Sequence, residues 1–262
     1  MSAADTMDIG LDAPAGRTVT IGGLPITVIG RADAARQMIR LASQHRHGRP
    51  WFLTSANGEV VARTATDPKL ARLFLDADQI VADGQPLVTA SRFLCREALP
   101  ERVATTDLFH DVARLAEKTG TTFYLFGASE AENRRAVAAA RTLYPCLDIV
   151  GSTHGYLKGE ALTTKLAEID ALAPDILWLG LGVPREQLFY RDHARALRHV
   201  GVIKTSGGLF DHMAGKVRRA PPLLQRLGFE WLWRLLMEPR RLAWRYLTTN
   251  PQALFFILTR SN

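Results

Sequence analysis

Apolar and polar positions along the chain follow two patterns, which are short buried runs and longer stretches with helical spacing. The apolar runs predict strands at 51–54, 80–82, 121–126, 147–151, 174–179 and 200–205. Between most of them lie stretches with helical spacing, such as 32–45, where Ala35, Met38, Ile39 and Ala42 recur on one face. Strands joined by helices of this length make right-handed crossovers. The pattern therefore predicts an α/β fold, with a mostly parallel sheet and helices on both faces.

Both ends of the chain depart from this alternation. Residues 17–30 read as two short strands around Gly22-Gly23, which predicts a hairpin. A helical stretch over 59–75 is interrupted at Asp67-Pro68, where we expect a second helix to begin. After Gly215 we expect a helix over 223–237, a break at Glu238-Pro239, and a basic, aromatic helix over 240–247. A short apolar segment over 251–258 follows.

The chain of 262 residues is long enough for one large domain with an appendage. We expect a disordered lead-in over 1–16, a catalytic domain over 17–215 and a helical tail over 216–262. The lead-in lacks the basic start and apolar centre of a signal peptide, and no apolar run reaches the length of a membrane span. Cys95 and Cys146 have no metal-type spacing. These features indicate a cytoplasmic protein.

Positive charge is concentrated in the tail. The segment 216–245 holds eight basic residues and two acidic residues, and so carries six of the seven net positive charges. A basic tail on a nearly neutral body indicates an anionic partner that the tail contacts. Arginine and tryptophan on an amphipathic helix suit a membrane interface. The alternative is a helical subdomain that packs on the sheet and turns its bases to solvent.

One carboxylate stands out in this pattern, that of Asp83. It follows the apolar run 80–82 and precedes Gly84, so the chain turns there at the end of a buried strand. In an open α/β sheet, ligands bind at this end of the strands. Asp83 is therefore a candidate catalytic residue. The structural alternative is that it caps the helix that begins near Gln85.

Small residues follow several of the other predicted strands. Turns without bulky side chains let phosphates approach backbone N–H groups, so a nucleotide is a reasonable ligand. The candidates for nucleotide binding are Gly127, Ala128, Gly180, Gly182, Gly207 and Gly208. Tight turns also use glycine for backbone reasons alone. The stretch Gly180-Leu181-Gly182 lacks the third glycine of the dinucleotide fingerprint, and no P-loop is present.

The sequence gives little support for a metal site or for a catalytic nucleophile activated by histidine. Asp76-Ala77-Asp78 resembles an Asp-x-Asp metal site, but it stands at the entrance of a strand, opposite the expected ligand end, and we interpret it as a capping or surface pair. The histidines are scattered without nucleophile–base spacing. We expect neither a metal site nor a cofactor.

Taken together and in order, several stretches over about 20–247 resemble the WecG/TagA/CpsF family of bacterial glycosyltransferases, glycosyltransferase family 26. The matching stretches are Ser55-Ala56-Asn57, Ala82-Asp83-Gly84, Arg102-Val103 with Asp107, Phe126-Gly127, Tyr144-Pro145, Val150-Gly151 with His154-Gly155-Tyr156, Pro174-Asp175, Gly180-Leu181-Gly182-Val183-Pro184, Gly208-Leu209-Phe210-Asp211 with Ala214-Gly215, Arg219-Ala220-Pro221, and Glu230-Trp231 with Arg234-Leu235 and Glu238-Pro239-Arg240.

The resemblance implies a Rossmann-like domain with a helical C-terminal appendage. It also implies an inverting transfer of a sugar from a UDP-sugar to a sugar on a polyprenyl diphosphate, with no metal site. Asp83 matches the family's proposed general base. Ser55 and Asn57 match positions that contact the donor sugar or the acceptor, and Arg102 matches a pocket arginine. Arg234, Arg241 and Arg245 match tail arginines that close over the site.

Three positions depart from the family pattern. Ser55 stands where the family usually has threonine, which keeps a hydroxyl. Thr105 stands where the family has a glycine. The family's Pro-Lys-Gln-Glu is here Pro184-Arg185-Glu186-Gln187, so the glutamate and glutamine are exchanged. We keep Gln187 as a candidate substrate-binding residue, and the exchange suggests a different donor sugar.

The resemblance leads us to expect a UDP-sugar donor of the UDP-glucose, UDP-N-acetylmannosamine or uronic acid type. It also implies a polyprenyl-diphosphate-linked acceptor in exopolysaccharide or cell-surface glycan assembly. We expect the tail to dock on the cytoplasmic face of the inner membrane, and a homodimer is compatible with the chain. We expect no nucleic-acid partner. Two alternatives remain: an NAD-type oxidoreductase on a similar sheet and a non-catalytic nucleotide-binding membrane adaptor.

Overall fold

The computed structural model describes residues 16–44, 48–217, 219–221, 224 and 230–262, so nearly all of the predicted lead-in lies outside the described residues. The described chain opens with a β-hairpin, β1 (Thr18–Ile21) paired antiparallel with β2 (Leu24–Thr27). Gly22 and Gly23 form its turn with φ angles of 59° and 85°. Glycine adopts such angles without strain, and the predicted hairpin is confirmed.

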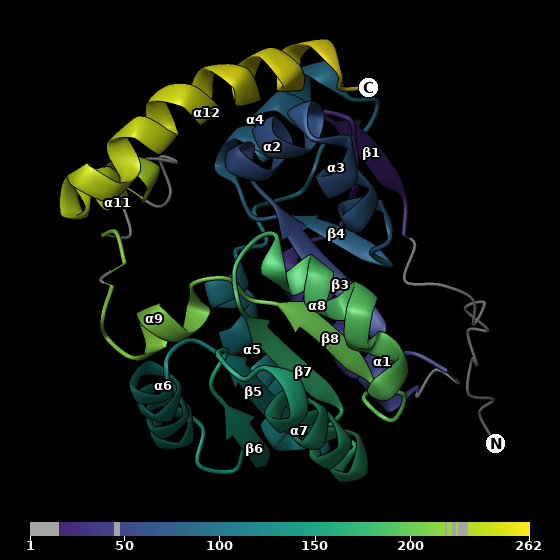
Figure 1. Cartoon of the computed structure of the whole chain (residues 1–262). Helices are drawn as coiled ribbons and strands as arrows, with labels where there is room; N and C mark the ends of the chain where they lie inside the picture. The colour runs from purple at the N-terminus through teal and green to yellow at the C-terminus, as the bar shows by residue number, and fades with distance from the viewer. Residues whose placement is uncertain (1–15, 45–47, 218, 222–223, 225–229) are drawn as a thin grey trace, which may run out of the picture.

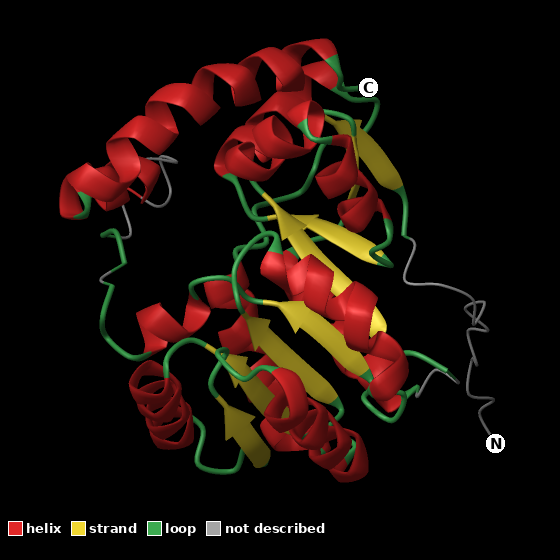
Figure 2. Cartoon of the chain, in the orientation of Figure 1, coloured by secondary structure: helices red, strands yellow, loops and turns green. Residues whose placement is uncertain are grey.

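A six-stranded parallel sheet forms the centre of the molecule (Figures 1 and 2). Its strands are β3 (Trp51–Ala56), β4 (Gln79–Ala82), β5 (Phe123–Gly127), β6 (Ile149–Thr153), β7 (Ile176–Gly180) and β8 (Val202–Thr205). Their order in space is β4-β3-β8-β7-β5-β6. Strands β3 and β8 are neighbours, yet the chain leaves them in different directions, towards α2 (Gly58–Thr66) and α9 (Leu209–Met213). Ligands of open α/β sheets bind where neighbouring strands diverge in this way.

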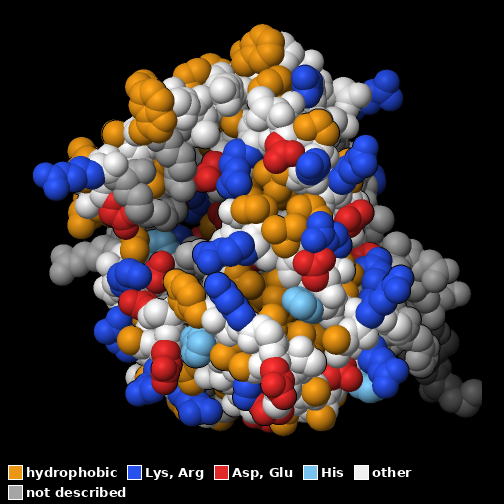
Figure 3. All heavy atoms as spheres, in the orientation of Figure 1, with side chains coloured by type: hydrophobic (Ala, Val, Ile, Leu, Met, Phe, Trp, Pro, Cys, Tyr) orange, Lys and Arg blue, Asp and Glu red, His pale blue; other side chains and the backbone are white. Residues whose placement is uncertain are grey.

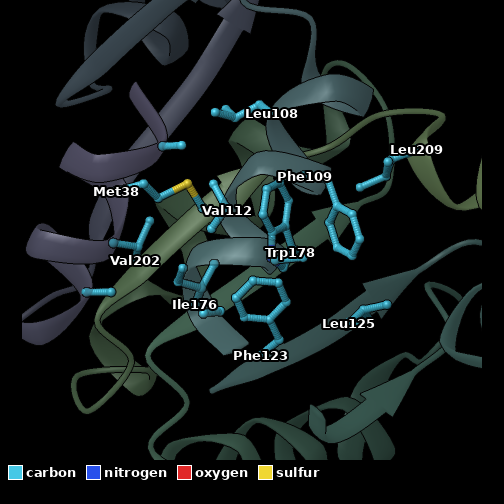
Figure 4. Close-up of a cluster of buried hydrophobic side chains, with 14 of the residues drawn as sticks. Met38, Leu108, Phe109, Val112, Phe123, Leu125, Ile176, Trp178, Val202 and Leu209 are labelled. Atoms are coloured by element: carbon cyan, nitrogen blue, oxygen red, sulfur yellow. The ribbon is translucent and has the colours of Figure 1, made fainter. Parts of the chain in front are cut away.

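Helices cover both faces of the sheet. One face carries α1 (Arg31–Ser43), α5 (Thr105–Thr119) and α6 (Glu130–Leu143), and the other carries α7 (Gly159–Leu172), α8 (Arg185–His193) and the turn η1 (Ala194–Ala196). On the first face Phe109 packs edge-on against Trp178, with ring centroids 4.9 Å apart (Figure 4). On the second face Phe52 stacks on Tyr190 at 4.0 Å. The predicted Rossmann-like α/β fold is confirmed.

A third buried cluster joins the hairpin to α2, α3 (Pro68–Leu75) and α4 (Gln85–Leu94). The predicted restart between α2 and α3 is confirmed. The Asp67 carboxylate accepts hydrogen bonds from the N–H groups of Lys69 (2.9 Å) and Leu70 (3.2 Å), and Pro68 begins α3. An aspartate before a proline is a favourable start for a helix, because proline fixes the first turn and the carboxylate satisfies its free donors.

The tail contains α11 (Glu230–Met237) and α12 (Pro239–Thr259). The predicted break at Glu238-Pro239 is confirmed. The predicted separation of 240–247 from 251–258 is wrong, since α12 continues through Pro251. The inner face of α12 buries Leu242, Ala253 and Ile257, and the helix packs along α2 (Figure 1). This packing keeps the helix continuous through Pro251, which removes one hydrogen bond.

The end of the described chain pairs with its beginning. Thr20 and Asn262 exchange backbone hydrogen bonds of 3.2 and 3.0 Å, and the N–H of Gly23 donates to the carbonyl of Arg260 at 2.9 Å. The tail is therefore attached to the body at the hairpin as well as along α2. The division at residue 215 stays a prediction based on composition.

Candidate active site

Two strand ends meet at Asp83. The carboxyl ends of the sheet point towards the side of the molecule where α9 and α11 lie (Figures 1 and 2). The N–H of Asp83 donates to the carbonyl of Ala56 at 2.8 Å, which ties the end of β4 to the end of β3. A Cβ atom on Gly84 would lie 3.1 Å from the Cα of Asn57. Glycine therefore lets the two turns lie against each other.

The Asp83 side chain does not cap the helix that follows it. The N-cap of α4 is Gly84, which has no side chain to accept a hydrogen bond. Instead, Asp83 Oδ2 accepts hydrogen bonds from the hydroxyl (3.0 Å) and the N–H (3.4 Å) of Thr105, the first residue of α5. The capping alternative for the helix near Gln85 is thus wrong. The carboxylate is turned towards α5 and remains partly exposed.

Competing effects set the protonation of Asp83. Burial raises the pKa of this carboxyl, while the charges of Arg102 and Lys204 and the hydrogen bonds from Thr105 lower it, and the net direction is upward. A raised pKa brings a carboxylate closer to the basicity that a general base needs near neutral pH. Perturbed groups at a ligand-binding sheet edge are good candidates for catalytic residues.

Ser55 stands next to this carboxylate on β3. Its hydroxyl lies 3.1 Å from the Thr105 hydroxyl and accepts a hydrogen bond of 2.9 Å from the Lys204 ammonium. Lys204 is 1% exposed. Burial lowers the pKa of Lys204 to about 8, although the charges of Asp83 and Glu186 oppose that shift. The structure therefore brings Ser55 and Asp83 together, as predicted for one site, and adds Thr105 and Lys204.

Arg102 is the third predicted residue in this group, and a network of charges holds it. Its guanidinium lies 2.6 Å from the Glu230 carboxylate of α11 and 3.9 Å from Asp107. Arg219 binds Asp107 through two contacts of 2.5 and 3.2 Å. Burial alone would raise the pKa of Asp107, but Arg219, Arg31 and Arg102 lower it. The network attaches the start of α11 to the edge of the site.

Asn57 lies at the end of β3, beside the Asp83 turn, where it is the N-cap residue of α2. Its side-chain oxygen accepts a hydrogen bond of 3.0 Å from the N–H of Val60 and so caps α2. The residue is exposed. Its amide nitrogen is not used by the cap, so the predicted contact with donor or acceptor stays compatible with the structure.

Gln187 lies apart from the Asp83 group. It is 1% exposed, and its amide nitrogen donates to the Thr54 hydroxyl at 3.3 Å. Thr54 alternates with Ser55 along β3, so it faces the opposite side of the sheet. The Gln187 carbonyl oxygen has no hydrogen-bond partner among the described residues. The structure does not bring this candidate beside the carboxylate, and its role in substrate binding stays a prediction.

Glu186, the other half of the exchanged pair, occupies the glycine-rich turns. Its carboxylate accepts hydrogen bonds from the N–H groups of Leu181 (3.1 Å) and Gly207 (2.7 Å), and also from Gly182. It is 2% exposed, and burial raises the pKa of this carboxyl against those hydrogen bonds. Two of the N–H groups predicted to hold a nucleotide therefore already have an acidic partner within the chain.

The other small residues shape the strand ends. Gly127 has a φ of 148°, and a Cβ there would lie 2.2 Å from the carbonyl oxygen of Gly180. The N–H of Ala128 donates to that same carbonyl at 3.0 Å. A Cβ on Gly180 would approach the Phe210 ring to 2.8 Å, whereas Gly208 faces open space. These positions fit tight packing between turns, and nucleotide binding by them stays a prediction.

The predicted tail arginines are placed only by their backbone. Arg234 belongs to α11, and Arg241 and Arg245 belong to α12. Their side chains lie outside the described part of the structure. The Glu230 contact with Arg102 shows that the helix carrying Arg234 begins at the site.

Sequence reasoning missed Lys204, Glu186 and Thr105. Lys204 gives the clearest signal in retrospect, because it interrupts an apolar strand at a position that must be buried. Charged residues are almost never fully buried without a partner, so a lysine there predicts a carboxylate nearby. In the sequence, Thr105 and Glu186 stand out only because they depart from the family pattern. Their contacts with Asp83 and the glycine turns depend on tertiary packing.

The Asp-x-Asp candidate lies at the opposite end of the sheet. Asp78 forms a two-contact ion pair with Arg49, both contacts 2.7 Å, and accepts a 2.8 Å hydrogen bond from the N–H of Phe52. The ion pair raises the pKa of Arg49. Among the described residues, no group of three or more His, Cys, Asp or Glu side chains could hold a metal ion. Asp78 therefore has a structural role.

Comparison with protein-family models gives one match over nearly the whole chain. The model described as the glycosyl transferase WecG/TagA/CpsF family matches residues 19–262. The match includes the hairpin, the parallel sheet and both tail helices. It is thus a match to the complete described architecture, not to one motif.

Proposed function

Because this chain belongs to the WecG/TagA/CpsF glycosyltransferase family, we propose that it transfers a sugar from a UDP-sugar to a sugar on a polyprenyl diphosphate, with inversion at the anomeric carbon. Membership makes the chain a glycosyltransferase and removes the oxidoreductase and adaptor alternatives. The proposed donor is of the UDP-glucose or UDP-N-acetylmannosamine or uronic acid type. The proposed pathway is assembly of an exopolysaccharide or cell-surface glycan at the cytoplasmic face of the inner membrane.

The observation that carries the proposal is the setting of the Asp83 carboxylate. It stands at the carboxyl end of β4, the edge strand that pairs with β3, and is partly exposed. Both hydrogen bonds from Thr105 go to one carboxylate oxygen, Oδ2, so they anchor the side chain through that oxygen alone. Burial raises the pKa of the group. An anchored carboxylate with raised basicity is suited to accept a proton from a hydroxyl.

The reaction is a single displacement. The oxygen of the acceptor hydroxyl attacks the anomeric carbon and forms the new glycosidic bond while the bond from that carbon to the diphosphate oxygen breaks. The hydroxyl proton passes to Asp83, and UDP leaves with the bonding electron pair. One carboxylate suffices, since inversion needs no covalent glycosyl-enzyme intermediate.

The leaving diphosphate gains negative charge that the protein must stabilise. Glu186 occupies N–H groups at two of the glycine turns, so those donors are not free for a phosphate. Arginine binds phosphate with two parallel hydrogen bonds and remains charged. We therefore assign this task to Arg234 of α11, which begins at the site edge, and to Arg241 and Arg245 of α12, which follows it directly. The same residues are suited to grip the acceptor diphosphate.

Membrane docking is supported by the outer face of α12. Trp244, Leu247, Leu254, Phe255 and Leu258 lie on that face, and each is at least 58% exposed. Figure 3 shows hydrophobic side chains along the same edge of the molecule. No helix in the described part of the chain is long and apolar enough to cross a bilayer. A half-apolar helix flanked by arginines suits binding in the plane of an anionic membrane surface.

Asp83→Asn tests the assigned base. The variant should lower kcat by about 10²- to 10⁴-fold, because a positioned general base contributes that much, and should keep UDP binding. The assay uses a panel of UDP-sugars with polyprenyl-diphosphate-linked glucose or N-acetylglucosamine and scores the product by mass. The same panel identifies the donor.

Asp76→Asn is the matched control, since this exposed carboxylate stands at the other end of the same strand. It should keep wild-type activity. An Asp83→Asn enzyme with more than about a tenth of wild-type kcat would exclude Asp83 as the base.

A further inference from the structure

Lys204 is a buried cation in the middle of the sheet. It belongs to β8, and its register partners are Leu53 of β3 and Trp178 of β7. Its ammonium donates to the Ser55 hydroxyl at 2.9 Å and to the carbonyl of Thr205 at 2.7 Å. A buried ammonium is strongly unfavourable unless it is paired with negative charge and hydrogen-bonded. Two carboxylates act on it, Asp83 beyond the end of β4 and Glu186 on α8.

A directed series of hydrogen bonds connects this cation to Asp83. The ammonium can only donate, so the Ser55 oxygen accepts its hydrogen bond. At the other end an ionised Asp83 can only accept, so the Thr105 hydroxyl donates to it at 3.0 Å. The Ser55 hydroxyl, 3.1 Å from Thr105, must then donate to the Thr105 oxygen. All hydroxyl directions are fixed when both ends are charged.

We propose that Lys204 is a positioning residue for glycosyl transfer and that the series Lys204–Ser55–Thr105–Asp83 keeps the Asp83 carboxylate ionised and correctly oriented. This inference rests on the proposed role of Asp83 as the base. Lys204 itself is 1% exposed and so does not touch the substrate. Its influence on the reaction passes through the two hydroxyls and through its charge.

The charged groups around Lys204 and Asp83 determine the pH range in which the series acts on the Asp83 carboxylate. Asp83 faces Lys204 from β4 and Arg102 from the loop before α5, and Glu186 faces Lys204 from α8. Arg219 lies near enough to Asp83 for their charges to interact. Burial lowers the pKa of Lys204 to about 8, so the ammonium is present throughout the acidic and neutral range.

The test compares pH profiles of kcat for the full-length wild type, Lys204→Met, Ser55→Ala and Ser55→Thr. Loss of a cation near a carboxylate raises the pKa of that carboxylate, so the acidic limb of the Lys204→Met profile should move up by about one pH unit. The deficit should be largest below pH 7 and should disappear above pH 8, where wild-type Lys204 loses its own proton. KM for the donor should change little.

The serine variants separate the hydrogen bonds from the charge. Ser55→Ala breaks the series while keeping the ammonium, so kcat should fall about tenfold or more across the whole pH range. Ser55→Thr keeps a hydroxyl and should restore kcat to within about threefold of the wild type. This pair also provides the test if Lys204→Met does not fold, which circular dichroism and UDP binding would reveal.

An unmoved acidic limb in folded Lys204→Met would overturn the charge effect, and equal rates for Ser55→Ala and Ser55→Thr would overturn the hydrogen-bonded series. Either result with an inactive Asp83→Asn enzyme leaves the proposed base in place. An active Asp83→Asn enzyme removes the base and this inference together.

Discussion

At the scale of single residues, the site is organised by buried charges that bind parts of the chain itself. Glu186 takes the N–H groups at the ends of β7 and β8, which a nucleotide-binding protein usually offers to phosphate. Lys204 balances both Glu186 and Asp83. The protein therefore has internal charges at positions where glycine-rich turns alone predict an external ligand.

This arrangement predicts a graded response to substitution of Glu186. Glu186→Ala leaves the N–H groups of Leu181, Gly182 and Gly207 without this acceptor, so the free energy of unfolding should fall by about 3 kcal/mol. Glu186→Gln keeps one acceptor oxygen for Leu181 and Gly207 and should lose about 1 kcal/mol. Urea unfolding monitored by circular dichroism measures both. Equal losses would mean that the hydrogen bonds at this position contribute little to stability.

At the scale of elements, the turn between β5 and α6 depends on glycine more strictly than the turn after β7. Gly127 combines a φ of 148° with a carbonyl oxygen 2.2 Å from any added Cβ. Gly182 has a φ of 76° and nothing within 4 Å. The first position is restricted by backbone angle and by space, and the second by backbone angle alone.

Gly127→Ala should therefore destabilise the protein by about 3–4 kcal/mol, and Gly182→Ala by about 1–2 kcal/mol. Thermal unfolding of both variants measures the difference. The two should differ even though the glycines look alike in sequence. If Gly182→Ala proves the more harmful, the spatial argument for Gly127 is wrong.

The sequence predicted the elements well because their signals are local. Apolar runs located the strands, Gly22-Gly23 located the hairpin, and Asp67-Pro68 located a helix start. The helix break predicted before Pro251 was wrong, because the packing that keeps α12 continuous comes from α2, far away in sequence.

The candidate site was predictable only in part. The position of Asp83 at a strand end follows from the pattern, but the direction of its side chain does not, and it turned out to face α5. Ser55 and Thr105 looked like unrelated departures from the family, yet their hydroxyls lie 3.1 Å apart. Such pairings depend on which helix packs over which strand, which local patterns do not encode.

At the scale of the whole molecule, α12 lies between the folded body and the solvent. Its inner face packs on α2, and its outer face presents five large apolar side chains to solvent. Several large apolar side chains exposed on one face of a helix are typical of an interaction site. Since the start of α11 contacts Arg102, the surface that we assign to the membrane and the site are joined by one continuous pair of helices.

Trp244→Glu combined with Leu254→Glu should therefore weaken binding to anionic lipid vesicles by tenfold or more, since each replaced side chain contributes roughly 1.5–3 kcal/mol of apolar burial. Co-sedimentation with phosphatidylglycerol vesicles measures the partition coefficient. Leu172→Glu is the control, because that exposed leucine ends α7, away from α12. Unchanged partitioning of the double variant would exclude the outer face of α12 as the membrane contact.

The pairing of residues 260–262 with the first hairpin has a consequence for the order of folding during synthesis. The N–H and carbonyl groups of Thr20 find these partners more than two hundred residues later in the chain. Ile257 likewise completes the cluster that includes β1 and β2. On the ribosome, the hairpin emerges long before α12, so it cannot form these contacts until α12 has also emerged. Contacts between residues so far apart in sequence form slowly. We therefore expect β1 and β2 to be among the last strands to become stable, although they are synthesised before the sheet.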